Sequence, residues 1–225
     1  MSTGDGLFAR LAAAADDDWQ AYVDHEFVRR MGDGSLPQAA FRHYLVQDYL
    51  FLIHFARAYA LAVYKGTTLE EMRSAYEGLK AILDVEMDLH VGLCGEWGLT
   101  PADLEAAPES RATMAYTRFV LETGLRGDLL DLHVALAPCV IGYAEIGRAL
   151  ASKAGALDEA NPYRVWIAEY SGGAYQSVAD AARKTLDDLA ARSLTEERFP
   201  QLVKIFGQAT RLEADFWQMG LTLAD

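Results

Sequence analysis

A cysteine in an apolar, interrupted helical segment is the first residue whose surroundings favour chemistry. Cys139 directly follows Pro138 and stands four residues before Tyr143, so the thiol and the phenol should share one helix face. The proline removes one backbone N–H and should bend the helix just before the thiol. Two interpretations remain open: an inert buried cysteine beside a core tyrosine, or a nucleophilic thiol in a pocket with a phenol.

Two carboxyl groups stand in similarly apolar surroundings. Asp48 lies in a mostly apolar run over residues 44–52, where an ionised carboxylate is costly unless something pairs with it. Glu213 precedes Phe216 and Trp217 by three and four residues, so it lies on an aromatic helix face, where it could act as an acid or a base. The alternatives are a structural pair or a solvent-exposed point of the helix for Asp48, and a surface position for Glu213.

Tyrosines offer flat apolar faces with a polar end. Tyr163, Trp166 and Tyr170 follow one another at helical spacing. Gly172 comes two positions later, so Tyr170 should lie at a helix end, where it can face a cavity. Tyr116 falls in another patterned helix. Most aromatic residues at such spacing belong to a core, and that interpretation stays open for each of these tyrosines.

Metal and phosphate chemistry have no matching motif. None of the five histidines is preceded three positions earlier by a glutamate, and the chain has neither a Cys-x-x-Cys nor a His-Glu-x-x-His motif. Glycine-rich phosphate loops are missing as well. We therefore expect no metal site.

Helices must position the candidate residues, because the composition is that of an all-α protein. The 225 residues include 37 alanines and 29 leucines but only six prolines, and no run alternates with the period of a strand. We expect one multi-helix bundle that forms a single domain over residues 1–225. The expected helices are Leu7–Met31 with a break near Asp24, Pro37–Tyr64, Thr68–Trp97, Ser110–Arg126, Asp128–Ala154, Pro162–Tyr170, Ala174–Ala191 and Thr195–Met219.

Capping residues mark several of the expected helix starts. Ser35 with Gln38, and Thr68 with Glu71, match the pattern of a capping box. Thr100 should begin a further turn after the helix that ends before it.

Charge and cysteine content narrow the partners and the compartment. The net charge of −13 would repel phosphate backbones and anionic lipid, so we expect neither nucleic-acid nor membrane binding. The apolar stretch Tyr44–Tyr64 could span a bilayer by length, but its four polar side chains favour a buried core helix. Two cysteines and the lack of a signal-peptide pattern indicate the cytoplasm.

Several segments, taken in order, resemble the TenA/thiaminase II family, whose members have the haem-oxygenase-like fold. The resemblance runs from Phe27 to Met219, and its specificity lies in the ordered set rather than in any one motif. The matching segments are residues 32–37, Tyr44-Leu45-Val46-Gln47-Asp48, Phe55-Ala56, Glu86-Met87-Asp88-Leu89-His90, Pro138-Cys139-x-x-x-Tyr143-x-Glu145-Ile146-Gly147, Tyr163-x-x-Trp166-Ile167-x-x-Tyr170 and Glu213-x-x-Phe216-Trp217.

The resemblance implies a hydrolase of thiamin metabolism, an aminopyrimidine aminohydrolase. The implied reaction releases the amine of 4-amino-5-aminomethyl-2-methylpyrimidine and yields the hydroxymethylpyrimidine used in thiamin salvage, with thiamin cleavage as a side activity. Cys139 matches the nucleophile, Glu213 the acid/base and Asp48 the carboxylate that binds the aminopyrimidine edge. Ring contacts are implied for Tyr116, Tyr143 and Tyr170. The family usually forms homotetramers and needs no cofactor.

Phe51 departs from the family pattern, which often has a tyrosine three residues after the aspartate. The missing hydroxyl could help to activate the thiol or orient water, so ring binding should survive while the hydrolysis rate could differ. A non-catalytic pyrimidine-binding or thiamin-binding protein, or a regulatory protein of the same fold, is therefore the alternative function. An oxidative, quinone-forming relative is less well supported, because Glu-x-x-His is missing and Cys139 is retained.

Overall fold

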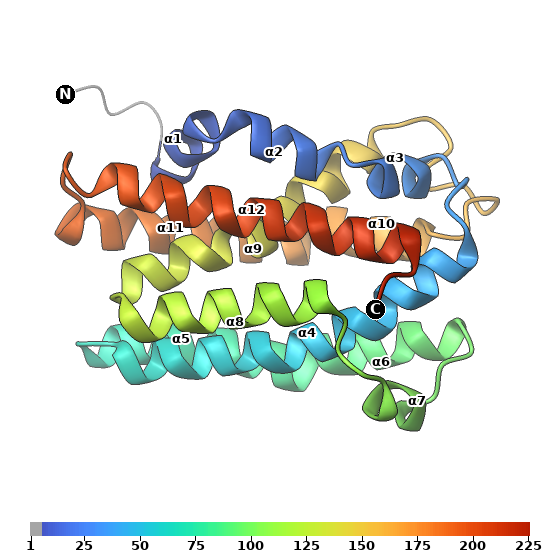
Figure 1. Cartoon of the computed structure of the whole chain (residues 1–225), viewed down its shortest axis with the longest axis horizontal. Coiled ribbons are helices and arrows are strands. Elements are labelled where there is room, and N and C mark those ends of the chain that lie inside the picture. The colour runs from blue at the N-terminus through green and yellow to red at the C-terminus, as the bar shows by residue number, and fades with distance from the viewer. Residues whose placement is uncertain (1–5) are drawn as a thin grey trace. The chain divides into compact units, whose positions relative to one another are not determined.

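The computed structural model describes residues 6–225, and every regular element within them is a helix (Figure 1). This confirms the predicted all-α class. The elements are α1 (Leu7–Ala14), α2 (Asp16–Val23), α3 (Glu26–Gly32), α4 (Gln38–Lys65), α5 (Leu69–Ala81), the π-helix η1 (Ile82–Glu86), α6 (Met87–Glu96), α7 (Pro101–Ala106), α8 (Arg111–Arg126), α9 (Leu129–Ala151), α10 (Arg164–Ser171), α11 (Gly173–Ser193) and α12 (Phe199–Thr222).

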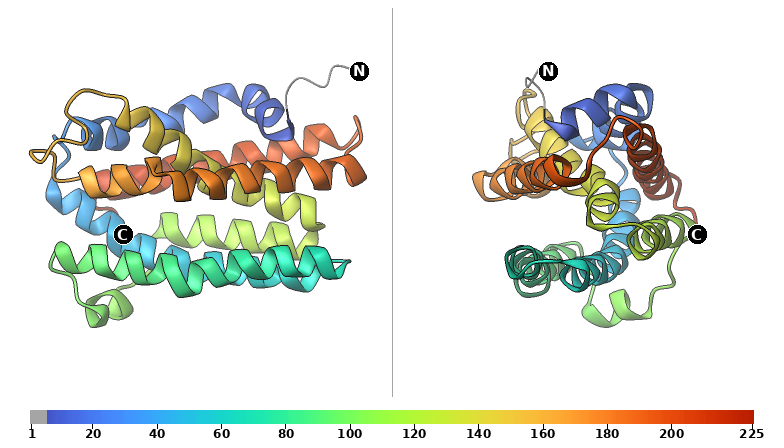
Figure 2. Two further views of the ribbon diagram at one scale, coloured as in Figure 1. Left: turned by 180° about the vertical axis from the view of Figure 1, so that it is seen from behind. Right: turned by 90° about the vertical axis from the view of Figure 1, so that its left-hand side faces the viewer.

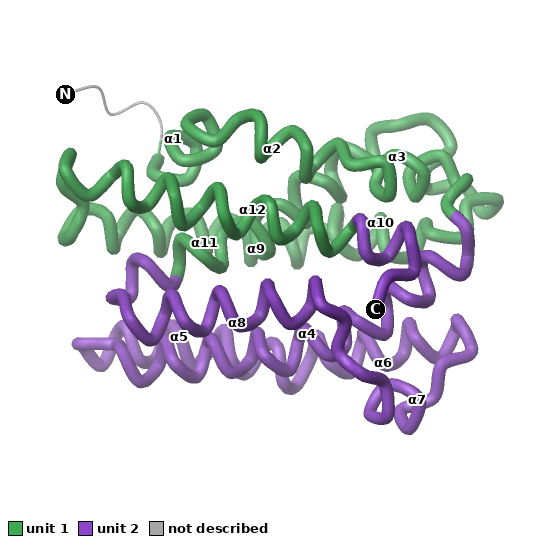
Figure 3. Tube along the Cα trace, viewed as in Figure 1, with its two compact units in different colours: residues 1–36, 133–217 green, residues 37–132, 218–225 purple. Residues whose placement is uncertain are grey.

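The chain divides into two compact units (Figure 3). Unit 1 holds residues 6–36 and His133–Trp217, and unit 2 holds Pro37–Leu132 and Gln218–Asp225. Helices α9 and α12 each contribute residues to both units. The single domain expected over residues 1–225 stays a prediction, and its first five residues lie outside the described part of the chain.

An aromatic cluster forms the core of unit 1. The rings of Tyr22 and Phe27 stack on the indole of Trp217, with centroids 6.3 and 5.0 Å away. At the start of α1, the backbone N–H of Leu7 donates a 2.7 Å hydrogen bond to Asp187 of α11. Helices from both ends of the chain are thereby joined within this unit.

Helix α4 is the central element of unit 2. Helices α5, α6 and α8 pack on it, and Figure 2 shows α5, η1 and α6 as one nearly continuous rod alongside α4. At its end, Lys65 donates a 2.7 Å hydrogen bond to the carbonyl of Gly127, just beyond α8. Buried side chains occur along most of α4, which confirms the core helix predicted for this apolar stretch.

The caps agree with the sequence at two helix starts and disagree at one. The capping box at Thr68 is confirmed, and Thr100 caps α7, where the sequence predicted only a turn. The box predicted at Ser35 is wrong: α4 starts at Gln38 without a side-chain cap. The N–H of Ser35 instead donates a 2.9 Å hydrogen bond to the carboxylate of Asp33, which closes a turn before the helix.

Two long predicted helices are interrupted. The predicted helix 7–31 breaks near Asp24 as expected, but it also breaks at Ala15. Three aspartates directly after Ala15 form the first turn of α2, where negative charge favours a new helix start. The predicted helix 68–97 is one rod of three pieces, because η1 inserts a wider turn between α5 and α6.

One described helix, α9, is long and apolar enough to cross a membrane. The part that meets these criteria is 78% buried inside the protein. Such burial is typical of a core helix.

Candidate active site

Asp48 on α4 is buried beside His90 of α6. The Oδ2 atom of Asp48 accepts a 3.2 Å hydrogen bond from the hydroxyl of Tyr44 and lies 3.4 Å from Nδ1 of His90. The other ring nitrogen of His90, Nε2, lies 2.9 Å from the backbone carbonyl oxygen of Leu45. The carboxyl group is thus paired through one of its oxygens, as the structural interpretation of Asp48 predicts.

Burial changes the acidity of both partners. It raises the pKa of Asp48 to about 7, and the hydrogen bond from Tyr44 offsets part of this rise. Burial lowers the pKa of His90 to about 4, while the contact with Leu45 acts in the opposite direction. Near neutral pH, a neutral imidazole therefore faces a carboxyl group that is close to its titration point.

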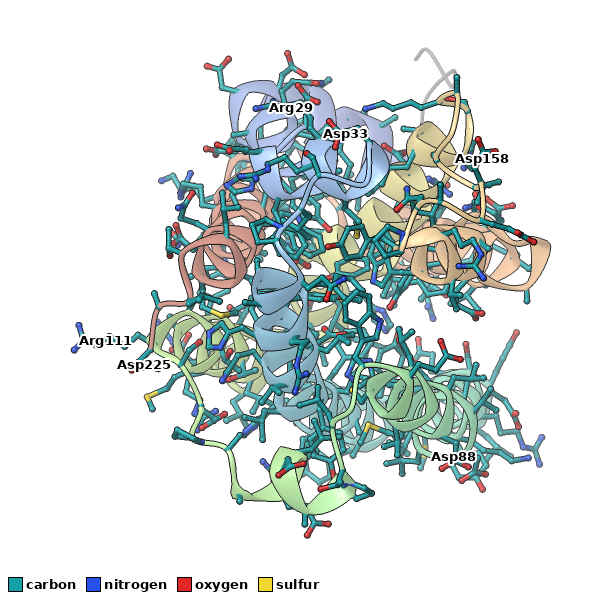
Figure 4. All side chains as sticks on the ribbon, turned by 90° about the vertical axis from the view of Figure 1, so that its right-hand side faces the viewer. Arg29, Asp33, Asp88, Arg111, Asp158 and Asp225 are labelled. Atoms are coloured by element: carbon teal, nitrogen blue, oxygen red, sulfur yellow. The ribbon has the colours of Figure 1, made fainter. Side chains whose placement is uncertain are left out.

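Cys94 lies one turn after His90 on α6 and is fully buried. Burial and the nearby charge of Asp48 raise the pKa of its thiol to about 12. Such a thiol is a poor nucleophile at neutral pH, which favours a packing role for Cys94. Unlike the buried side chain of Cys94, the side chain of Asp88 on the same helix points outwards (Figure 4).

An aromatic ring that follows Asp48 on α4 contacts a ring of α8. Phe51, three residues after Asp48, has its ring centroid 5.0 Å from that of Tyr116 on α8. Phe55 extends the row, with its centroid 5.5 Å from Phe51. The structure therefore places Tyr116, a predicted ring-contact residue, beside Phe51, the residue that departs from the family pattern.

Gln47 fixes the start of α8, and with it the position of Tyr116. Its Oε1 accepts hydrogen bonds from the Ser110 N–H over 2.9 Å and from the Thr113 hydroxyl over 2.7 Å. Its Nε2 donates a 2.9 Å hydrogen bond to the carbonyl of Pro108. This role of Gln47 was not predicted, although Gln47 is a second polar residue in the apolar run that contains Asp48.

In unit 1, Cys139 lies half-buried on α9, directly after the helix-internal Pro138. The carbonyl oxygen of Pro138 accepts a 3.2 Å hydrogen bond from the hydroxyl of Tyr22 on α2. Gly142 makes room for this ring, because a Cβ built there would lie 2.5 Å from it. A residue of α2 therefore fixes the helical turn that carries the thiol.

Glu213 on α12 is 1% exposed, so the surface interpretation of this residue is wrong. One turn later, Trp217 has its ring centroid 5.3 Å from that of Tyr143. The ring of Tyr143 in turn lies 5.0 Å from that of Tyr170. The predicted aromatic face of Glu213 is thus part of the same cluster as the two predicted tyrosines.

Close backbone packing positions Tyr170 near the end of α10, as predicted. A Cβ built on Gly147 of α9 would lie 2.6 Å from the carbonyl carbon of Tyr170 and 2.8 Å from the nitrogen of Ser171. Gln176 donates a 2.8 Å hydrogen bond to the same carbonyl. Tyr163, by contrast, donates its hydroxyl proton to the Leu36 carbonyl, and this confirms its core interpretation.

Each unit therefore holds part of the predicted set. Unit 2 holds Asp48, Phe51 and Tyr116, and unit 1 holds Cys139, Tyr143, Tyr170 and Glu213. His90 was not predicted as the partner of Asp48, because its position in a matching segment does not indicate a contact with another helix. Among residues 6–225, no group of three or more His, Cys, Asp or Glu side chains could hold a metal ion.

Comparisons with known proteins show what the chain as a whole is similar to. The TENA/THI-4/PQQC family matches residues 12–223. An aminopyrimidine aminohydrolase from Halalkalibacterium halodurans is 39% identical, over 94% of this chain and 93% of that protein.

Solved structures are similar to this chain as well. A TenA family transcription regulator from Silicibacter is 47% identical, covers 96% of each chain and superimposes with a TM-score of 0.91. A domain of unknown function with a haem-oxygenase-like fold, from Shewanella denitrificans, is 16% identical over 99% of this chain and 94% of that one, with a TM-score of 0.74. It supports the fold alone, and the predicted haem-oxygenase-like fold is thereby confirmed. The match over nearly the whole sequence shows that the chain belongs to the TENA/THI-4/PQQC family.

Proposed function

We propose that the chain is an aminopyrimidine aminohydrolase of the thiaminase II type. It hydrolyses 4-amino-5-aminomethyl-2-methylpyrimidine to ammonia and the hydroxymethylpyrimidine used in thiamin salvage, and cleavage of thiamin is a proposed side activity. The family and the name of the Halalkalibacterium relative support this reaction class.

The observation that carries the proposal is the buried Asp48 carboxyl group next to the paired rings of Phe51 and Tyr116. A carboxyl group can pair with the amino group of a pyrimidine, and aromatic faces can hold its flat ring. Acidic groups whose pKa is raised by burial are common at functional sites, which supports a role for Asp48.

In the proposed mechanism, the thiolate of Cys139 adds to the ring carbon adjacent to the one that bears the aminomethyl group. The ring loses its aromaticity, and its electron pair forms a double bond to the exocyclic carbon while the C–N bond breaks. Water then adds to this methylene, the C–S bond breaks, and the thiolate and the aromatic ring are restored.

Glu213 supplies the proton transfers in this proposal. Its carboxyl group protonates the departing amine, which leaves as ammonia, and the resulting carboxylate takes a proton from the incoming water. The net reaction consumes one water and releases one ammonia, and it needs no redox partner. Burial of Glu213 among aromatic rings supports a role as acid and base.

An ammonia-release assay on the aminomethyl pyrimidine tests the proposal. Cys139→Ala should lose the activity while hydroxymethylpyrimidine still binds, and Glu213→Gln should lower kcat more than it changes KM. Cys94→Ala is the matched control and should keep its activity, because its thiol is not the proposed nucleophile. Full activity in Cys139→Ala would exclude covalent catalysis by this residue.

A pyrimidine-binding or regulatory protein is the second candidate. The 47% identical structure from Silicibacter is described as a transcription regulator, and Phe51 lacks the hydroxyl that the family often has. This candidate predicts that the wild-type chain binds hydroxymethylpyrimidine but releases no ammonia from the aminomethyl compound. The same assay therefore separates the two functions.

Assembly and location are part of the proposal as well. We propose a cytoplasmic homotetramer formed by one domain per chain. The low cysteine content supports a reducing compartment. The exposed apolar side chains of α5 support the association of several copies of the chain.

A further inference from the structure

His90 is a buried histidine to which the proposed mechanism gives no role. Its Nε2 lies 2.9 Å from the backbone carbonyl oxygen of Leu45. A carbonyl oxygen can only accept a hydrogen bond, so Nε2 must carry the hydrogen. The other nitrogen, Nδ1, is therefore left to interact with Asp48, 3.4 Å away.

Asp48 and His90 hold one proton between them. Without a proton between Oδ2 and Nδ1, two lone pairs would face each other, and a buried negative charge would have the Tyr44 hydroxyl as its hydrogen-bond donor but no positively charged partner, which is costly. Because burial raises the pKa of Asp48 to about 7 and lowers that of His90 to about 4, the proton resides on the carboxyl group below neutral pH. The protonated Oδ2 then faces the acceptor nitrogen Nδ1 across 3.4 Å, and both groups are uncharged.

Other titratable groups near Asp48 do not alter this arrangement. Tyr44 on α4 donates to the carboxyl group, and Cys94 on α6 keeps its proton because its pKa is about 12. Within residues 6–225, no charged side chain of α5, α7 or α8 contacts Asp48, and Arg118 of α8 pairs with Glu109 instead.

The two contacts of the Asp48 carboxyl group leave one oxygen for a ligand. Both Tyr44 and His90 interact with Oδ2. Within the described residues, the hydrogen bond and the ion-pair contact of this carboxyl group both involve Oδ2, and none involves Oδ1. With the proton held at Oδ2, Oδ1 can only accept a hydrogen bond. It therefore suits an exocyclic amino group and not an oxo group, which has no hydrogen to donate.

We infer that His90 is a positioning residue that makes the site select a 4-aminopyrimidine over a 4-oxopyrimidine. It does so by holding Oδ2 of Asp48, so that the acceptor Oδ1 meets the ring. The inference rests on the proposed function, which assigns Asp48 to the edge of the pyrimidine.

Calorimetric binding of hydroxymethylpyrimidine and of its 4-oxo analogue tests the inference without turnover. The wild-type protein should prefer the amino compound by about 10- to 100-fold, the range expected for one buried hydrogen bond. His90→Leu should reduce this preference to about threefold or less, because only the 3.2 Å hydrogen bond from Tyr44 then holds the carboxyl group.

Two amide variants separate positioning from packing. The amide of His90→Asn lies where Nδ1 is and should keep most of the preference, whereas that of His90→Gln lies nearer Nε2 and should lose it. His43→Asn is the matched control, because Nε2 of His43 also contacts a backbone carbonyl, that of Ala224, but in an exposed position. Equal preferences in the Asn and Gln variants of His90 would overturn the inference, and so would a wild-type protein that binds both rings alike.

The binding experiment and the turnover experiment test the two proposals independently. If ammonia is not released but the preference depends on His90, the hydrolase proposal falls and the inference stands. An active enzyme whose preference ignores His90 overturns the inference alone.

Discussion

At the scale of single residues, Asp48 and His90 should have opposite effects on how the unfolding free energy changes with pH, and these two effects should cancel. The unfolded chain at about pH 5 carries one proton on this pair, on the histidine, since the ordinary pKa values are 3.8 and 6.5. The folded chain also carries one, on the carboxyl group. Because both states bind the same number of protons, the pair should add no pH dependence to the unfolding free energy between about pH 4 and 6.5.

Substituting either residue should reveal the pH dependence of stability that the other residue contributes. In His90→Asn, folded Asp48 keeps a proton that the unfolded chain has lost, so stability should fall as the pH rises from about 4 to about 7. In Asp48→Asn, the folded histidine lacks a proton that the unfolded chain holds, so stability should rise from about pH 4 to 6.5. Each slope, relative to the wild type, should be at most about 1.4 kcal/mol per pH unit.

Urea unfolding at about pH 4.5, 5.5 and 6.5 measures both slopes. The wild type serves as the reference for all other titrating groups. Slopes of the same sign in the two variants would contradict the shared proton.

The sequence could indicate which types of residue take part in the site, but not which side chains they contact. Cys139 and Glu213 stand out because their neighbours at helical spacing are visible along the chain. The contact of Asp48 with His90 depends on how α4 packs on α6, and no local pattern encodes it. Burial likewise decided that Glu213 is not a surface residue, and one helix seen alone cannot show this.

At the scale of elements, Gln47 should stabilise the contact between α4 and the start of α8. Gln47→Leu would leave the buried Ser110 N–H and the carbonyl of Pro108 without their partner. We expect a loss of about 2–4 kcal/mol in unfolding free energy and a higher KM, because Tyr116 is carried by α8. Gln20→Leu, which removes an exposed hydrogen bond to Asp16, should change stability by less than about 0.5 kcal/mol.

Gly147 should be equally intolerant, for a steric reason. In Gly147→Ala the new methyl group would meet the backbone of Tyr170 and Ser171, which cannot move as a flexible side chain can. We expect a loss of about 1–3 kcal/mol and a weaker substrate affinity. Gly92→Ala is the control: nothing lies within 4 Å of its Cβ position, so alanine should stabilise the helix. Similar effects of the two substitutions on stability would contradict close packing at Gly147.

Helix positions were predictable to the extent that local chemistry sets them. Thr68 caps its helix through its own side chain and that of Glu71, so a short pattern suffices. Ser35 has the same pattern, but its N–H is engaged by Asp33, two residues earlier, and the box does not form. The π-helix η1 has no such local signature in the sequence. It is one wider turn within the rod formed by α5 and α6, and no capping pattern marks it.

At the scale of the whole molecule, the exposed apolar residues of α5 favour self-association. Leu69, Met72 and Tyr76 are three and four residues apart, so they share one helix face, and they are 61%, 39% and 52% exposed. Contiguous apolar surface of this kind commonly marks an interface. We expect the proposed homotetramer to bury this face.

Light scattering coupled to size exclusion should give a mass of about 99 kDa, four times the 24.8 kDa of the chain. Met72→Glu combined with Tyr76→Glu should lower this mass, because two charges would be buried in the interface. Ser74→Glu adds a charge at an exposed position two residues from both Met72 and Tyr76, which lies on another side of the helix, and should leave the mass unchanged. A wild-type mass near that of one chain would contradict the tetramer. A tetramer that persists in the double variant would instead show that another face mediates assembly.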